Sequence, residues 1–138
     1  MSKSITCLLL LAFVVSTITT PAYGVLVFRK EFEQKYKVKE PETDVEVKLS
    51  DAASEAKCYI CHVKGEDKEV RNEYGEALAK YLDAENFSKD RRDAEPEKVK
   101  QEIWEGLDKV EADKNAAGEA FGDLLRAGKL PVPLPADE

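Results

Sequence analysis

The chain of 138 residues is poor in the nitrogen and sulfur side chains that bind zinc and iron. It contains one histidine, one methionine and three cysteines. A structural zinc site is normally built from four Cys or His ligands, so a conventional zinc module is not expected. Two of the three cysteines and the only histidine nevertheless fall within the five positions from Cys58 to His62. This clustering is the most informative feature of the sequence.

The sequence also lacks the groupings that catalysis requires. We find no paired general acid and base, no nucleophile beside a base, and no phosphate-binding glycine loop in a supporting context. The composition gives 28 acidic against 21 basic residues, which disfavours binding to nucleic acid or to an anionic membrane. We therefore expect a protein that is not an enzyme and has no nucleic-acid partner.

The first 24 residues have the pattern of a secretory signal peptide. Lys3 is followed by an apolar run over residues 5–15, a polar stretch, and the small-x-small sequence Ala22-Tyr23-Gly24. An uncleaved membrane anchor is the alternative, because no charge occurs between Lys3 and Arg29. Cleavage after Gly24 is favoured, and it predicts a periplasmic or secreted protein with no membrane association.

Cleavage would change the chemistry of the remaining chain. It would remove Met1, Lys3 and Cys7, leaving a formal charge of −8 with Cys58 and Cys61 as the only cysteines. In an oxidising compartment a free cysteine pair tends to close as a disulfide unless another group claims it.

The rest of the sequence favours one all-α domain over residues 25–130, followed by an extended proline-rich tail over 131–138. Ala, Glu, Lys and Leu are abundant and β-branched runs are few. We expect four to five helices: a short one carrying Phe28, Phe32 and Tyr36, one from an N-cap at Ser50 to about Gly65, and others over 71–82, 96–110 and 115–128. Residues 83–96 are expected to form a solvated connection.

Cys58, Cys61 and His62 form the C-x-x-C-H pattern for covalent attachment of a c-type haem. On a helix their spacing of i, i+3 and i+4 places all three on one face. Two thiols one turn apart can add to the two vinyl groups of the porphyrin, and the adjacent histidine can coordinate the iron as proximal ligand. The pattern predicts one covalently attached haem c, with His62 as the metal ligand.

Three other interpretations of these residues stay open. Zinc would need carboxylates to complete its shell. A thioredoxin-like redox pair normally occurs in a βαβ unit, which the helical sequence lacks. A plain Cys58–Cys61 disulfide in a haem-free interaction module is possible, although it gives His62 no role.

The chain resembles the small exported single-haem c-type cytochromes of bacteria. In these proteins the C-x-x-C-H helix is followed by an Asn-x-aromatic-Gly segment, here Asn72-Glu73-Tyr74-Gly75. The resemblance implies a helical domain around one haem, single-electron transfer, and a redox partner protein, which the charge of this chain suggests is basic or neutral. It also places Tyr74 near the haem, although core packing is the simpler interpretation. Asn72 is expected to cap the helix that it opens, rather than to bind a propionate.

The chain departs from this family at the sixth iron ligand, which is usually methionine and less often histidine. Neither remains after signal cleavage once His62 is used. The candidates are a lysine such as Lys64, Lys68 or Lys80, a tyrosine oxygen, the amine of Val25, a water, or nothing. An open position would favour the alternative function of a haem-based sensor that binds small ligands. We expect aromatic residues to form much of the haem wall: Phe28, Phe32, Tyr36, Tyr59, Tyr74, Trp104 and Phe121.

Overall fold

The structure is a computed structural model that describes residues 23–136 of the chain. Within this range the chain forms helices and no strand, so the predicted all-α class is confirmed. The α-helices are α1 (Tyr23–Lys35), α2 (Asp44–Ala56), α3 (Glu73–Ala79), α4 (Lys89–Ala94), α5 (Pro96–Val110) and α6 (Phe121–Arg126), with 3-10 helices η1 (Lys57–Ile60) and η2 (Ala84–Phe87).

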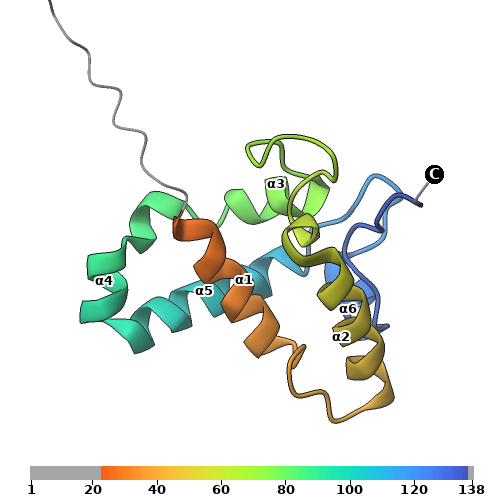
Figure 1. Cartoon of the computed structure of the whole chain (residues 1–138), viewed down its shortest axis with the longest axis horizontal. Coiled ribbons are helices and arrows are strands. Elements are labelled where there is room, and N and C mark those ends of the chain that lie inside the picture. Colours follow the sequence, from red (N-terminus) through yellow and green to blue (C-terminus); the bar gives the residue numbers. More distant parts are fainter. Residues whose placement is uncertain (1–22, 137–138) are drawn as a thin grey trace, which may run out of the picture.

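The longest helix, α5, runs through the middle of the molecule and contacts α1, α3 and α4 (Figure 1). Its bounds agree with the prediction, with Pro96 at the start of the helix, where a missing N–H costs nothing. The predicted stripe of Val99, Ile103, Leu107 and Val110 is fully buried. The helix therefore forms because its apolar face supplies the centre of the core.

Helix α2 begins earlier than predicted, because Thr43 and not Ser50 is its N-cap. The Thr43 hydroxyl accepts a hydrogen bond from the Glu46 N–H, and the Glu46 carboxylate accepts one from the Thr43 N–H. This reciprocal capping box satisfies two N–H groups at the start of the helix. Ser50 lies inside α2, where its hydroxyl donates to the carbonyl of Val38. The proposed cap at Ser50 is wrong.

The last helix is shorter than the predicted span of 115–128. Asn115 folds back on the chain, with its side-chain oxygen accepting from the Glu119 N–H at 2.9 Å. Gly118 has φ of 82°, a left-handed conformation that ends helical continuation. Residues 115–120 therefore form a turn, and α6 begins only at Phe121.

The predicted connection over 83–96 is largely solvent-exposed, as expected, but it is not a plain connection. It contains η2 and α4, and it buries Phe87. The ring of Phe87 packs edge-on against Phe28 of α1, with centroids 5.3 Å apart. The segment thus closes one side of the core against α1.

The proline-rich tail packs on the domain as far as the structure describes it. Leu130 and Pro131 are buried, and Val132 and Leu134 pack against the core cluster. The predicted signal peptide lies outside the described residues except for Tyr23 and Gly24, with which α1 begins. No helix in residues 23–136 combines the length and the apolar character needed to cross a membrane.

Candidate functional site

Cys58, Cys61 and His62 lie on a tight turn that directly follows α2, and not on a continuous α-helix as predicted. Lys57 breaks the helix with φ of 52° and ψ of −114°. After this kink the carbonyl of Cys58 accepts from the N–H groups of Cys61 at 3.3 Å and His62 at 3.2 Å. The turn therefore keeps local helical bonding and still brings the three side chains together.

Asn72 fastens this turn to the start of α3. Its Nδ2 donates to the carbonyls of Tyr59 at 3.1 Å and Ile60 at 3.0 Å. Its backbone N–H donates to the carbonyl of Cys61 at 3.0 Å. The Oδ1 atom accepts from the Gly75 N–H at 2.9 Å, which confirms the predicted helix cap. One side chain thus caps α3 and holds the carbonyls of the cysteine turn.

Gly75 allows the second contact between α3 and the turn. A Cβ atom added to Gly75 would lie 2.1 Å from the carbonyl oxygen of Cys61, far inside van der Waals contact. Only glycine permits this approach of two backbones. The backbone of α3 therefore lies directly against the cysteine turn at Gly75.

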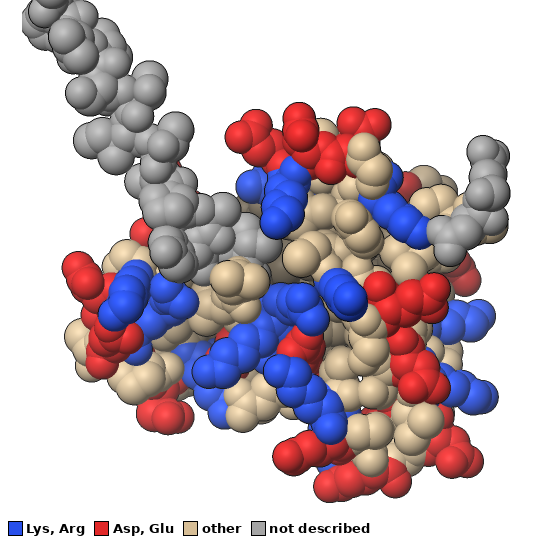
Figure 2. Space-filling model, in the orientation of Figure 1, with Lys and Arg blue, Asp and Glu red and all other residues tan. Residues whose placement is uncertain are grey.

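A closed loop follows the histidine. His62 and Arg71 form an isolated antiparallel bridge, and the Val63 N–H donates to the carbonyl of Val70 at 3.1 Å. The loop between them exposes Glu66, Asp67 and Glu69, and acidic side chains gather at that edge of the molecule (Figure 2). The pairing fixes the backbone of His62 from both sides.

The side chains of Cys58, Cys61 and His62 line one cavity of about 460 Å³. Its other walls come from α1, α3, the segment that leads from α3 into η2, and α5, and they are largely apolar. They include Phe28, Phe32, Leu78, Leu82 and Leu107. Apolar walls with a few convergent polar groups are typical of cofactor and ligand sites, which measure about 300–1,000 Å³.

The remaining residues predicted at the site have mixed positions. Phe28 and Phe32 line the cavity, whereas Tyr36, Tyr59, Trp104 and Phe121 are not among its lining residues. Tyr74 is fully buried behind it, with its ring edge-on to Phe32 and Phe121. Its hydroxyl has no hydrogen-bond partner, and burial raises its pKa well above the ordinary value.

None of the three lysines named as ligand candidates reaches this cavity. Lys64 lines a separate hollow between α2 and the tail. Lys80 lies on the other side of α3, 3.9 Å from Asp113. Lys68 is exposed in the loop after the histidine. Among the described residues, the lysine that does line the cavity is Lys57, and no sequence feature pointed to it.

Burial controls the protonation of the motif. It lowers the pKa of His62, and the nearby Arg71 and Lys68 act in the same direction, while the Val70 carbonyl opposes them. The neutral imidazole is the form that binds metals, and its Nδ1 is buried without a hydrogen-bond partner. Burial also raises the pKa of the Cys61 thiol to about 12, with Cys58 adding to the shift. Such a thiol is a poor nucleophile for disulfide exchange at neutral pH.

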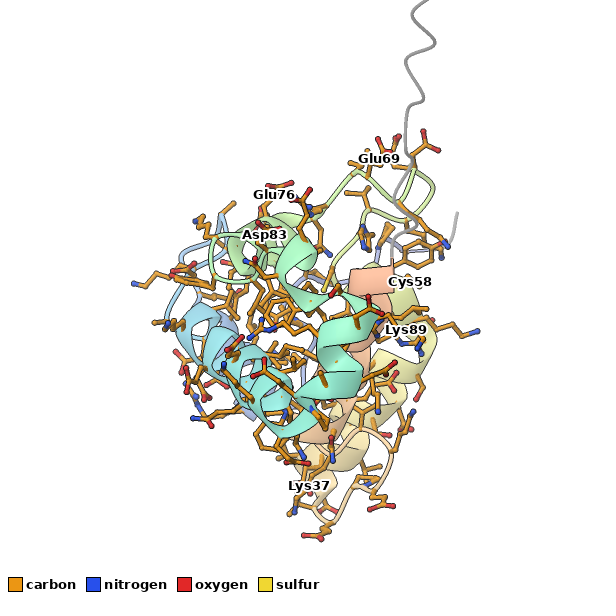
Figure 3. The ribbon with its side chains drawn as sticks, turned by 90° about the vertical axis from the view of Figure 1, so that its left-hand side faces the viewer. Lys37, Cys58, Glu69, Glu76, Asp83 and Lys89 are labelled. Carbon is orange, nitrogen blue, oxygen red and sulfur yellow. The ribbon has the colours of Figure 1, made fainter. Side chains whose placement is uncertain are left out.

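Charges of both signs surround the cavity mouth. Arg29, Lys57 and Arg71 lie among its lining residues, together with Asp83 and Glu85. Cys58 lies toward the same end of the molecule as Glu69 and Asp83, and Lys37 marks the opposite end (Figure 3). The strong net negative charge of the chain is therefore not concentrated at the mouth.

Comparison with known proteins adds no assignment. No family model matches the chain, and no curated protein and no solved structure shows significant similarity to it. Within the described part of the chain, no group of three or more His, Cys, Asp or Glu side chains is arranged to hold a metal ion, and both Cys58 and Cys61 are free thiols.

Proposed function

We propose that the chain is an exported single-haem c-type cytochrome that transfers single electrons. The observation that carries this proposal is the convergence of Cys58, Cys61 and His62 on one cavity with apolar walls. The residues fit the group, since the imidazole is neutral, its Nδ1 is buried and unpartnered, and the cavity can enclose an apolar macrocycle. A bound haem would supply a reversible one-electron change at its iron.

Each motif residue has a separate role in this proposal. Cys58 and Cys61 would hold the haem, each thiol adding across one vinyl group so that sulfur bonds to one carbon and the thiol hydrogen goes to the other, with no oxidant consumed. His62 supplies the proximal nitrogen. Asn72 and the His62–Arg71 bridge hold the backbone of the turn. Phe28, Phe32 and Leu107 line the cavity and would shield a bound haem from water, and burial of a haem in this way helps to set its reduction potential.

The proposal is tested by exporting the mature protein from a host with cytochrome c maturation machinery. We expect haem absorption that survives denaturation, and a mass raised by one haem. Cys58→Ser with Cys61→Ser should abolish covalent retention, and His62→Ala should change the iron spectrum. Tyr59→Ala is the matched control, since Tyr59 lies in the same turn but does not line the cavity. Two titratable thiols in the mature protein, with no haem, would refute the proposal.

A further inference from the structure

The cavity contains few groups that could act as a second iron ligand opposite His62. Outside the motif, its charged lining residues are Arg29, Lys57, Arg71, Asp83 and Glu85. Arginine stays protonated and has no lone pair to offer. Asp83 is exposed, and its Oδ1 accepts from the Glu85 N–H at 3.0 Å as the cap of η2. Glu85 is exposed as well, so both carboxylates lie at the mouth.

Lys57 is the one lysine among the described residues that line the cavity. It is exposed, and it immediately precedes Cys58 in the turn that carries the motif. It therefore belongs to the same wall as His62. The facing walls come from α1, α3, the turn after α3, and α5. They are built from Phe32, Leu78, Leu82 and Leu107, all of them more than nine-tenths buried.

On the basis of the haem site proposed above, we propose that the apolar wall of Phe32, Leu78, Leu82 and Leu107 leaves the sixth iron position without a protein ligand and admits a small neutral diatomic such as carbon monoxide or nitric oxide. Apolar side chains cannot coordinate iron. They also disfavour an anion at the same position, because burying an unpaired charge among them costs free energy. The wall thus selects the ligand by charge.

The test uses the mature haem-loaded protein. Carbon monoxide is added to the reduced form and azide to the oxidised form, and absorption spectra are recorded. We expect carbon monoxide to shift the haem absorption, whereas azide at a hundredfold higher concentration leaves it unchanged. Covalent haem that ignores carbon monoxide would overturn the open position while leaving the haem proposal intact. Azide binding as tight as that of carbon monoxide would overturn the selection by charge. Absence of covalent haem would instead refute the function proposed above.

Substitutions in the apolar wall test whether carbon monoxide binds against it. Leu78→Met, Leu82→Met and Leu107→Met each conserve volume and bring a thioether to the cavity. We expect at least one of them to lower the affinity for carbon monoxide tenfold or more. Leu49→Met is the matched control, because Leu49 is buried in α2 but does not line the cavity. Equal affinity in all four variants would show that the ligand does not bind against this wall.

Lys57→Ala tests directly whether the lysine that lines the cavity binds the iron. If Lys57 does not bind iron, this variant binds carbon monoxide with the affinity of the unsubstituted protein. A tenfold gain in affinity would identify Lys57 as a displaced ligand and overturn the proposal. The low-spin signal of the oxidised protein, measured by electron paramagnetic resonance, distinguishes the two cases without any electron-transfer assay.

Discussion

At the scale of single residues, Asn72 does more than its sequence position suggests. An asparagine before a helix predicts a cap, and the cap is present. The Nδ2 of Asn72 also donates to the carbonyls of Tyr59 and Ile60, which lie 13 and 12 positions earlier in the chain. No local rule could find these hydrogen bonds, because they depend on how α3 docks against the cysteine turn.

Substituting Asn72 separates these two roles. Asn72→Ala removes the cap and both Nδ2 bonds, and we expect the free energy of unfolding to fall by about 2–3 kcal/mol. Asn72→Asp keeps the acceptor for the Gly75 N–H but cannot donate to the two carbonyls. We expect this variant also to be destabilised and to retain less covalent haem after export. Denaturant unfolding and haem content measure the effects. An aspartate variant indistinguishable from the unsubstituted protein would reduce Asn72 to a cap alone.

The environment of Glu33 predicts how the stability of the fold depends on pH. Burial alone would raise the pKa of its carboxyl, but hydrogen bonds from Lys39 and Arg29 bring it below the ordinary value of 4.5. A lowered folded-state pKa stabilises the fold above the unfolded pKa, and this contribution is lost as pH falls through the folded value. We expect Glu33→Gln to lower the thermal midpoint at pH 7 and to have progressively less effect below pH about 4. The exposed Glu40→Gln is the control. A difference that stays constant over this pH range would contradict the assignment.

At the scale of elements, α3 depends on its contact with the cysteine turn. Gly75→Ala would place a Cβ atom 2.1 Å from the Cys61 carbonyl oxygen and 3.0 Å from its carbon. Both atoms are backbone, so α3 must move away from the turn. We expect a loss of about 2 kcal/mol of stability or more, together with a lower yield of haem-bound protein. Glu76→Ala, exposed on the same helix, is the control. Unchanged stability of Gly75→Ala would show that α3 and the turn can shift without cost.

The helices that could be predicted from the sequence are those with a strong local signal. Helix α5 has a proline start and a continuous apolar stripe, and its bounds were predicted correctly. The start of α2 was misplaced because Ser50 and Thr43 are both good N-caps, and only the partner at Glu46 decides between them. Helix α4 was missed because it buries none of its own residues, and the burial of Phe87 beside it requires α1.

The candidate site divides in the same way. The convergence of Cys58, Cys61 and His62 followed from their spacing, even though they lie on a turn after a kink at Lys57. The opposite wall of the cavity could not be predicted from the sequence, since nothing there distinguishes Leu78, Leu82 and Leu107 from ordinary core residues. The resemblance to c-type cytochromes placed Tyr74 near the haem. In the structure its ring packs between Phe32 and Phe121 and does not line the cavity. Whether Tyr74 lines the cavity depends on how the helices pack, which the local sequence does not determine.

At the scale of the whole molecule, net charge and local charge give different information. Removal of residues 1–24 would leave a formal charge of −8, which attracts a basic partner at long range. The cavity mouth carries both signs, with Arg29 and Arg71 beside Asp83 and Glu85. Long-range attraction is screened beyond about 8 Å at physiological ionic strength. For the redox partner expected from the sequence, charge would act mainly on the rate of encounter.

The cavity also determines how stable the molecule is without an occupant. Apolar side chains that face an unfilled cavity lose packing contacts on that side, which costs free energy. The mouth is open beside Leu26, which is 61% exposed, so water offsets part of this cost. The apolar walls of Phe32 and Leu107 gain little from that water. A bound haem would shield these apolar walls from water.

Stability should therefore follow haem content. We expect the mature chain with Cys58→Ser and Cys61→Ser to lack covalent haem and to melt at least about 10 °C lower than the loaded protein, a difference of roughly 3 kcal/mol. Calorimetry on matched samples measures it. The unsubstituted chain exported without maturation machinery controls for the serine substitutions, and its midpoint should match that of the double variant. If loaded and haem-free chains melt together, the haem does not fill this cavity, and the packing of α1, α3 and α5 alone sustains the fold.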